Sequence, residues 1–517
     1  MKMRETVDIA KLIGEFVIFS ISINTMPSYY DPDYLKTVLQ AVEELFPILE
    51  KETALSKKEL ARVHSSNKMS AVNLVYYRAI RGRDLSALQN ALGFLGISRL
   101  ARAQRHVKGS LEGIRYILRK LTDDRQAETP VPDLSIQDGM NMLDKNTEQL
   151  LGMLSGDRRV RIMVTLPSEA SHDYELVKRI VGGATNLVRI NCAHDTPDDW
   201  KNMIYHVKKA GREFKKEIKI AMDLAGPKIR TGGMDKPLLI KPDDAIYIHK
   251  EPFTPDKESE KYHITCSSPV VFDSVKVGEH ILFDDGKIMA EITETKSDHF
   301  VAKTLVAGID GKKLKKNKGI NLPDSNLDLT GLTKKDKEDL KFVVTHADIV
   351  NVSFVNTAQD IKQLIEELKK HHTKEDFGVV LKIETKKAFT NLIDILLHGM
   401  RWGPVGVMIA RGDLAVETGW ANMARLQTEI VNICGAAHVP VIWATQVLES
   451  LAKKGTPARS EITDAAASLK AECVMLNKGP HIVETIILLD AMLSNMEAYQ
   501  SKSSAMSPRL DVSANLV

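Results

Sequence analysis

The sequence predicts an α/β protein built on a closed (β/α)₈ barrel, with a small β domain inserted into it and an all-α region before it. Between residues 156 and 500, eight short runs of aliphatic and β-branched residues alternate with longer amphipathic segments. Runs such as 378–383 ("GVVLKI") and 439–444 ("VPVIWA") are almost entirely apolar, which suits parallel strands buried on both faces. Eight such units close a barrel. A doubly wound sheet is the alternative, but no glycine-rich phosphate loop follows the first strand.

Residues 1–155 are expected to be helical. Asp31 stands before Pro32 and an apolar-periodic run over 34–49, as an N-cap residue stands before a helix. A second helix is expected over 100–118, where apolar residues recur every three or four positions beside many basic ones. Those basic residues favour a solvated face, with an anionic partner as the alternative. The polar stretch 122–136, which contains two prolines, is expected to be a linker.

The barrel strands and the insertion follow in order. Between the third and fourth strands, "HILFDDGKIMAEI" (280–292) is typical of a β-hairpin with Asp285 and Gly286 at its turn. The strand candidates are 158–166, 186–191, 218–224, 348–354, 378–384, 405–413, 439–446 and 472–476. We therefore predict a helical extension at 1–155, the barrel at 156–231 and 323–500, the inserted β domain at 232–322 and a tail at 501–517.

Composition narrows the class of protein. A chain of 517 residues allows about three structural units. The contents of 43% hydrophobic and 27% charged residues are those of a globular protein. The net charge of +3 argues against nucleic acid or a membrane as partner, and the apolar run 12–23 is shorter than the about 20 residues of a spanning helix. Four scattered cysteines without a CxxC pair favour a reducing compartment, the cytoplasm, with an organelle as the alternative.

Polar residues gather at the predicted carboxyl ends of the strands, where barrels of this class carry their active sites. The basic ones could converge on a phosphate or a carboxylate. Glu384 and Asp413 could share a hard divalent cation. The pattern predicts a phosphorylated, anionic substrate with Mg²⁺, and salt bridges at the barrel rim are the alternative. The set comprises Arg189, Asn191, His194, Asp223, Lys228, Arg230, Lys382, Glu384, Arg411, Asp413, Thr445, Gln446 and Glu449.

Seven segments in this region carry a family resemblance. They are "LVRINCAHD", "MDLAGPKIRTG", "KGINLP", "LKIET", "VMIARGDLAVE", "VIWATQVLES" and "PARSEITDAA". In their order and spacing, over about 158–480, the chain resembles the pyruvate kinase family. The resemblance implies that the insertion is a small β-barrel lid domain. It also implies that the phosphoryl group of phosphoenolpyruvate passes to ADP, giving pyruvate and ATP.

The same resemblance implies roles for individual residues. Glu384 and Asp413 would bind Mg²⁺, with Mn²⁺ as the alternative metal. The implied catalytic residues are Lys382, which neutralises charge on the transferring group, Arg189 and Arg230, which hold phosphates, and Thr445, which belongs to the proton-delivery network. The implied substrate-binding residues are Ala410, Arg411, Gly412 and Ser353. The implied nucleotide-binding residues are His194, Lys318 and Asp285.

The chain departs from the family at its monovalent-cation site. The family uses Asn, Ser, Asp and a Thr carbonyl there. Asn191 and Asp223 match this set, whereas Ala193 and Leu224 do not. Lys228 stands where potassium-dependent members carry Glu, and a tethered ammonium can replace a bound K⁺. We therefore expect activity that does not require K⁺.

Further departures leave alternatives open. "NKGPHIVE" (477–484) replaces the family's "SGETAKG" loop, and Lys478 is a candidate phosphate contact there. The helical extension resembles atypical pyruvate kinase-like proteins of bacteria and plants, and we expect no sugar-phosphate regulation through a C-terminal domain. The alternatives are a phosphoenolpyruvate- and Mg²⁺-binding enzyme with a different acceptor, or a non-catalytic regulatory protein. A homo-oligomer formed through the barrel is expected by resemblance, and the partner of the helical region is not predicted.

Overall fold

The computed structural model describes residues 30–124, 127–154, 158–234, 236–252, 262–329, 331–371, 373–374 and 376–497. The apolar run 12–23 and the tail 501–517 lie outside these residues. The chain divides into two compact units, one formed by Met1–Lys58 with Val72–Met140 and the other by Glu59–Ala71 with Asn141–Val517. Among the described residues, no helix combines the length and the apolar character needed to cross a bilayer.

The first unit is helical, as predicted, although two helix boundaries differ. Asp31 caps α1 (Pro32–Glu43) through its side chain. The helix is interrupted at Glu44, and a second helix, α2, follows (Leu45–Leu55). Pro47 explains the break, because proline is tolerated in the first turn of a new helix and not in the middle of one. The helix predicted from residue 100 begins only at Val107, after a 3₁₀ turn at Ala103–His106.

The remaining helices of this region are α3 (Lys57–Leu60), α4 (Lys68–Arg81), α5 (Ser86–Phe94), α6 (Val107–Leu121) and α7 (Ile136–Leu151). Much of the basic charge on α6 is engaged inside the first unit. Arg119 donates to Glu43 at 2.5 Å, Lys108 donates to Asp133 at 3.2 Å, and the Arg115 guanidinium lies 4.1 Å from the centre of the Phe46 ring. These contacts support the interpretation of a satisfied helix surface over that of an anion-binding face.

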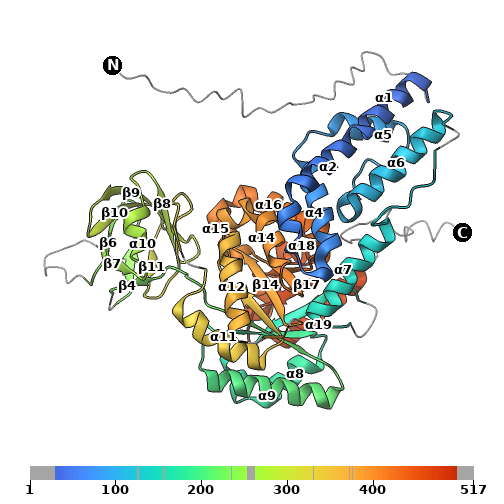
Figure 1. Ribbon diagram of the computed structural model, residues 1–517. Helices are drawn as coiled ribbons and strands as arrows, with labels where there is room; N and C mark the ends of the chain where they lie inside the picture. Colours follow the sequence, from blue (N-terminus) through green and yellow to red (C-terminus); the bar gives the residue numbers. More distant parts are fainter. Residues whose placement is uncertain are drawn as a thin grey trace, which may run out of the picture. The chain divides into compact units, whose positions relative to one another are not determined.

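The second unit contains the predicted barrel. Eight parallel strands close in the order β1-β17-β16-β15-β14-β13-β3-β2, so each strand pairs with its neighbours in the sequence of barrel strands. Helices lie around the labelled strands β14 and β17 (Figure 1). This confirms the (β/α)₈ fold. The strands are β1 (Arg161–Thr165), β2 (Leu187–Asn191), β3 (Lys219–Asp223), β13 (Ile349–Val352), β14 (Gly378–Ile383), β15 (Val405–Ala410), β16 (Val441–Ala444) and β17 (Cys473–Leu476).

Helices surround these strands. They are α8 (Tyr174–Gly182), α9 (Pro197–Phe214), α11 (Lys334–His346), α12 (Ala358–Lys370), α13 (Lys386–Thr390), α14 (Leu392–Gly399), α15 (Arg411–Thr418), α16 (Trp420–Ala436), α17 (Glu449–Lys454), α18 (Arg459–Ala467) and α19 (Ile482–Met496). Capping boxes at Thr196 and Thr333 begin α9 and α11. Such caps satisfy backbone N–H groups that have no partner within the helix.

The amino ends of the strands, which we call the barrel floor, are covered by the end of α7. Leu150 and Leu151 belong to the apolar cluster inside the barrel. Gly378 and Gly406 lie beneath Leu150, and a Cβ at either position would come within 2.6 Å or 2.5 Å of its methyl groups. Only glycine therefore permits this close approach.

A second segment from before the barrel also lies at the floor. Asn67, at the end of the 3₁₀ turn Ser65–Asn67, donates from its amide to the carbonyls of Met400, Trp402 and Gly403 at 3.2, 2.9 and 3.1 Å. Those carbonyls precede β15. Residues 59–71 and 141–154 therefore belong to the same compact unit as the barrel.

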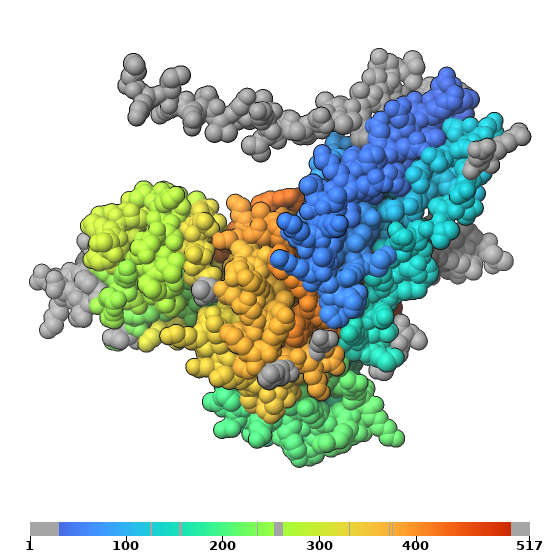
Figure 2. Space-filling model, viewed as in Figure 1, coloured from blue at the N-terminus to red at the C-terminus, as the bar shows by residue number. Residues whose placement is uncertain are grey.

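The insertion between β3 and β13 forms a lobe of its own (Figure 2). Its main sheet runs in the order β12-β8-β9-β10-β6-β7-β4, and β11 pairs with β5 in a second, two-stranded sheet. The strands are β4 (Thr231–Gly232), β5 (Leu238–Ile240), β6 (Ala245–His249), β7 (Tyr262–Cys266), β8 (His280–Phe283), β9 (Ile288–Thr295), β10 (His299–Val306), β11 (Lys312–Leu314) and β12 (Ile320–Asn321). A short helix, α10 (Val270–Ser274), lies between β7 and β8.

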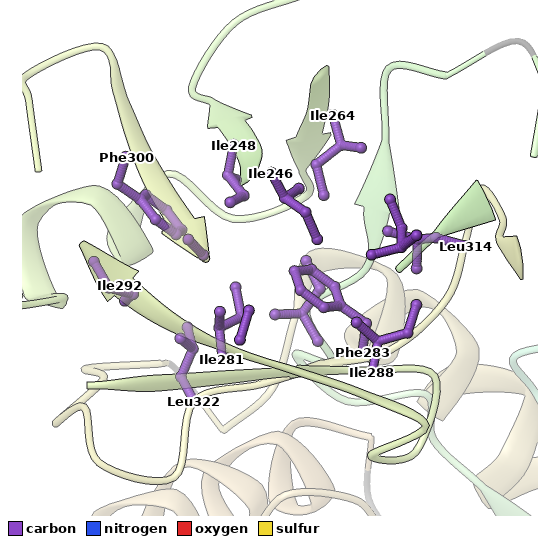
Figure 3. Close-up of a cluster of buried hydrophobic side chains, with 14 of the residues drawn as sticks. Ile246, Ile248, Ile264, Ile281, Phe283, Ile288, Ile292, Phe300, Leu314 and Leu322 are labelled. Carbon is purple, nitrogen blue, oxygen red and sulfur yellow. The ribbon is translucent and has the colours of Figure 1, made fainter. Parts of the chain in front are cut away.

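Both sheets of the insertion enclose one apolar core (Figure 3). Ile246, Ile264, Phe283 and Ile288 are buried in it. The predicted hairpin is confirmed by the antiparallel pairing of β8 with β9. Its turn residues Asp284, Asp285 and Gly286 all have positive φ, at 51°, 58° and 77°, as the Asp-Gly sequence predicts for a tight turn.

Candidate active site

Lys382 lies at the centre of the charged residues at the carboxyl ends of the strands, which we call the barrel mouth. Its ammonium donates to Ser353 Oγ at 2.7 Å and lies 3.1 Å from Glu384 Oε1 and 3.3 Å from Asp223 Oδ2. Burial opposes the positive charge, but Glu384 and Asp223 outweigh it, so the pKa of Lys382 is raised. The barrel therefore holds a buried, charged ammonium with three oxygen neighbours.

Arg189 and Asp223 complete this buried network. The Arg189 guanidinium donates to Asp223 Oδ2 at 2.7 Å and to Thr165 Oγ1 at 3.1 Å, while Asn351 donates to Asp223 Oδ1 at 2.6 Å. Burial raises the pKa of Asp223, but Arg189 and Lys382 outweigh burial and the net shift is downward. Asp223 is therefore ionised and shared between two cations. Asn351 was not predicted from the sequence, because a lone Asn in an apolar strand gives no sign of its partner.

Glu384 and Asp413 supply the carboxylates expected to bind a metal. Glu384 Oε2 accepts the backbone N–H of Phe354 at 2.5 Å, and Asp413 Oδ1 accepts from Lys228 at 2.7 Å. Burial raises the pKa of Glu384, Lys382 opposes this, and the negative charge of Asp413 raises it further. The charge of Asp413 thus disfavours ionisation of Glu384, and a dication between the two carboxylates would relieve this.

The donor set fits a hard cation. Among the described residues no cluster of three or more His, Cys, Asp or Glu side chains is arranged to hold a metal. Mg²⁺ needs no such cluster, because it is usually bound by one or two carboxylates together with water and substrate oxygens. Glu384 and Asp413 therefore suit Mg²⁺, or Mn²⁺, in the presence of an anionic substrate.

The residues expected at the monovalent-cation position lie in two places. Asn191 and Asp223 are direct neighbours in the pairing of β2 with β3. Asn191 Oδ1 accepts the N–H of Ala193 at 3.1 Å, and both oxygens of Asp223 are engaged by the groups described above. Lys228, by contrast, directs its ammonium to Asp413 and lies 5.9 Å from the centre of the Phe354 ring.

The start of α15 meets the loop after β16. Gly412 N–H donates to Thr445 Oγ1 at 2.9 Å. The Arg411 guanidinium donates to Ala444 O at 3.0 Å and also contacts Asp464 and Thr445 O, so its charge is used to hold the loop. Thr445 and Gln446 have φ values of 66° and 56°, in the left-handed region that non-glycine residues rarely adopt. Backbone strain of this kind is common at functional sites. Ala410 ends β15 directly before Arg411.

A cavity of 280 Å³ opens between the ends of β1, β2 and β17, and its lining includes Arg189, Asn191, His194, Asn477 and Lys478. Burial lowers the pKa of His194, and the positive charge of Lys478 lowers it further. The positive charges of Arg230 and Arg189 act in the same direction. The replaced loop thus contributes a cation to this cavity, whose lining also includes Asp195 and Glu449.

Three predicted site residues lie toward the inserted domain. Arg230 donates to Asn317 O at 3.2 Å, and the Lys318 ammonium lies 2.8 Å from Asp284 Oδ1. Lys318 is thus paired with Asp284, the neighbour of Asp285 in the hairpin turn. Neither Lys318 nor Asp285 is among the described residues that line the His194 cavity. Sequence alone does not separate two adjacent aspartates in one turn.

Comparison with known proteins defines the class. A family model described as pyruvate kinase, barrel domain, matches residues 157–480. The chain is 30% identical to a pyruvate kinase of Thermotoga maritima over 347 residues, which cover 66% of this chain and 71% of the relative. It is 32% identical to a pyruvate kinase of Debaryomyces hansenii over 369 residues, or 68% of each chain.

A pyruvate kinase of Bacillus licheniformis is 30% identical over 370 residues, which cover 68% of this chain and 59% of the relative. The chain belongs to the pyruvate kinase family and is a phosphotransferase of that type. The part of the chain before residue 157 lies outside the matching model.

Proposed function

We propose that the protein transfers the phosphoryl group of phosphoenolpyruvate to ADP, giving pyruvate and ATP, with Mg²⁺ and without a requirement for K⁺. The observation that carries the proposal is the buried Lys382, which lies beside Asp223 and Glu384 at 3.3 and 3.1 Å. The relatives named pyruvate kinase support the reaction.

Arg189 and Lys382 are proposed to bind the transferring phosphoryl group. Such transfer depends on positioning and electrostatics more than on covalent chemistry by the protein. Asp223 holds both cations in place before substrate arrives, so little reorganisation is needed when charge develops. Lys382 would also neutralise the enolate that remains once the phosphoryl group has left. Arg230 would reach the phosphates from the side of the inserted domain.

Glu384 and Asp413 would hold Mg²⁺. When bound, the metal supplies Lewis-acid polarisation of phosphoryl oxygens and neutralises charge. Phe354 N–H and the Lys228 ammonium orient the two carboxylates through the hydrogen bonds described above.

The other end of the substrate is proposed to lie at the start of α15. Backbone N–H groups in the first turn of a helix have no partner within it and favour anions. The backbone of Ala410, Arg411 and Gly412 would therefore bind the substrate carboxylate, with the N–H of Gly412 shared between the carboxylate and Thr445 Oγ1. Thr445 Oγ1 accepts from Gly412, which leaves its own O–H to donate toward the enolate carbon. Ser353 donates to Leu224 O at 2.7 Å and so presents its lone pair to Lys382.

The acceptor is proposed to occupy the His194 cavity. Its cations suit the phosphate chain of a nucleoside diphosphate. Lys478 would take the place of contacts that the family's loop supplies, and Lys318 and Asp285 would approach from the inserted domain. Because 477–484 differs from the family pattern, a different acceptor is the second candidate function.

Activity without K⁺ is proposed because cationic side chains already lie beside Asp223 and Asp413. Both oxygens of Asp223 are engaged by Arg189, Lys382 and Asn351. Lys228 adds a further fixed cation beside Asp413. A cytoplasmic location is proposed because all four cysteines are free thiols, three of them buried.

The proposal is tested by following pyruvate and ATP together, with phosphoenolpyruvate, ADP and Mg²⁺ and no K⁺. We expect equal amounts of the two products, and no turnover when Mg²⁺ is chelated. Pyruvate without ATP would show that another acceptor takes the phosphoryl group. Binding of phosphoenolpyruvate with no turnover would contradict catalysis and favour a regulatory role.

A further inference from the structure

A second cavity of 340 Å³ lies between the barrel and the inserted domain, and we call it the hinge pocket. Both crossings of the chain between the two domains line it, through residues 227–229, 320–327 and 329. Phe354 and Glu417 also contribute to its wall. Lys382, Glu384 and Asp413 are not among the described residues that line it, so it is distinct from the proposed metal site, although Lys228 borders both.

Asn321 leaves one acceptor in the hinge pocket unused. Its side chain is 4% exposed, and its Nδ2 donates to Glu417 Oε1 at 2.9 Å. Its Oδ1 is buried and has no hydrogen-bond partner among the described residues. Buried polar atoms are rarely left unpaired, so this oxygen calls for a donor from outside the described residues, such as a ligand of the pocket.

The remaining walls restrict the chemistry of that donor. Ile229, Leu322 and Phe354 make much of the surface apolar. Burial raises the pKa of Glu417 to about 7, although Asn321 donates to it, so about half of this carboxyl is neutral at neutral pH. Lys386 and Lys387 lie on the wall and disfavour a cation. A carboxylate ligand would bring acceptors only and would leave Asn321 Oδ1 unsatisfied.

We propose that the hinge pocket binds a small uncharged ligand that combines an apolar body with an N–H donor, such as a primary amide. The donor pairs with Asn321 Oδ1 and the body fills the space beside Leu322 and Phe354. Binding itself does not depend on the function proposed above.

The position of the pocket gives such a ligand an effect on the mouth. Phe354, on one wall, donates its backbone N–H to Glu384 at 2.5 Å and holds a positive φ of 54°. Lys228, on another wall, donates to Asp413 at 2.7 Å. The pocket thus borders both residues that orient the proposed metal-binding carboxylates, so its occupant alters the metal affinity of the site.

The test measures binding of benzamide to the full chain by titration calorimetry. Acetophenone is the matched probe, because it has nearly the same shape and no N–H donor. We expect benzamide to bind about tenfold more tightly than acetophenone, both with and without saturating phosphoenolpyruvate and Mg²⁺. Equal binding of the two probes, no binding of either, or displacement of benzamide by phosphoenolpyruvate would overturn the proposal. This readout stays valid even if the protein does not turn over phosphoenolpyruvate.

Two variants locate the binding. Asn321→Leu removes the unused acceptor and should abolish the preference for benzamide. Thr390→Trp narrows the pocket from an exposed position that should not disturb folding, and it should weaken benzamide about tenfold. Thr345→Trp is the matched control, since both threonines are exposed and both donate to the carbonyl four residues earlier. Equal benzamide affinity in the two tryptophan variants would contradict the location.

Discussion

Both ends of the barrel contain buried side chains, but those at the mouth are charged and those at the floor are apolar or neutral. At the mouth, Arg189, Asp223, Lys382 and Glu384 are ion-paired and largely buried. At the floor, the methyl groups of Leu150 lie against glycines, and Asn67 makes neutral hydrogen bonds. Burying charges costs more than burying apolar groups, and replacing a buried ion pair with apolar residues is often stabilising. The mouth therefore retains its charges for chemistry, while the floor contributes stability.

The largest expected effect comes from removing the central charge of the mouth. Lys382→Met should lower kcat by about 10³-fold, because the developing charge loses a fixed cation. The protein should stay folded, since Asp223 keeps Arg189 and Asn351 as partners. Steady-state kinetics and thermal unfolding measure both effects. Lys370→Met is the control, as this lysine is exposed and pairs with Glu367 on α12. If Lys382→Met unfolded, or retained full activity, the conclusion that the mouth retains its charges for chemistry would be contradicted.

At the floor, a substitution is expected to lower stability and to leave activity unchanged. Leu150→Ala should lower the free energy of unfolding by about 2–5 kcal/mol, because Gly378 and Gly406 have no side chains to fill the cavity. Below the unfolding temperature kcat should not change. Leu55→Ala, at a side chain that is 71% exposed, should change stability by no more than about 0.5 kcal/mol. Chemical denaturation measures both variants, and equal losses would show that Leu150 does not stabilise the floor.

The pH dependence of stability should arise at Glu417, in the hinge pocket beside the mouth, and not at the floor. The pKa of Glu417 is raised from 4.5 to about 7, chiefly by burial, so the folded state holds this proton more tightly than the unfolded state. Stability is then lost as the pH rises from 4.5 through 7, where the unfolded chain ionises first.

Glu417→Gln should remove this loss. Its stability relative to the unchanged protein should increase over the same pH range by at most about 3 kcal/mol, measured by denaturation without Mg²⁺. The effect of Leu150→Ala should be the same at every pH. If the difference caused by Glu417→Gln did not vary with pH, the raised pKa would be refuted.

The smallest expected effect is that of potassium. Because Lys228 already supplies a cation beside Asp413, adding K⁺ should change kcat by less than about twofold. Tetramethylammonium chloride at equal ionic strength is the control. Activation by K⁺ beyond that limit would show that the fixed charges of the mouth are incomplete.

The sequence predicted the fold well because strands buried on both faces leave a strong pattern. All eight apolar runs became barrel strands, and the Asp-Gly turn placed the hairpin of the insertion. The helical region was predicted less well. Its periodicity continues across Glu44, and the proline that forces a new start at Leu45 lies inside the expected helix.

Which residue types meet at the mouth could be predicted from the sequence, whereas the partner of each side chain could not. Lys382 and Glu384 are two positions apart on one strand, so their proximity follows from the strand itself. Other ion pairs depend on how separate loops fold. They are Lys228–Asp413, Lys318–Asp284 and Arg411–Asp464. A contact between distant loops produces no periodic pattern in a single sequence. The Asn321–Glu417 hydrogen bond could not be predicted for the same reason.

The central claim is that the buried charges of the mouth hold a divalent cation together with phosphoenolpyruvate. Binding of Mn²⁺, followed by electron paramagnetic resonance in the presence of phosphoenolpyruvate, tests this without reference to the acceptor. The account predicts a single tightly bound Mn²⁺ per chain that is lost in Glu384→Gln and retained in Lys370→Met. Unchanged Mn²⁺ binding in Glu384→Gln would contradict it.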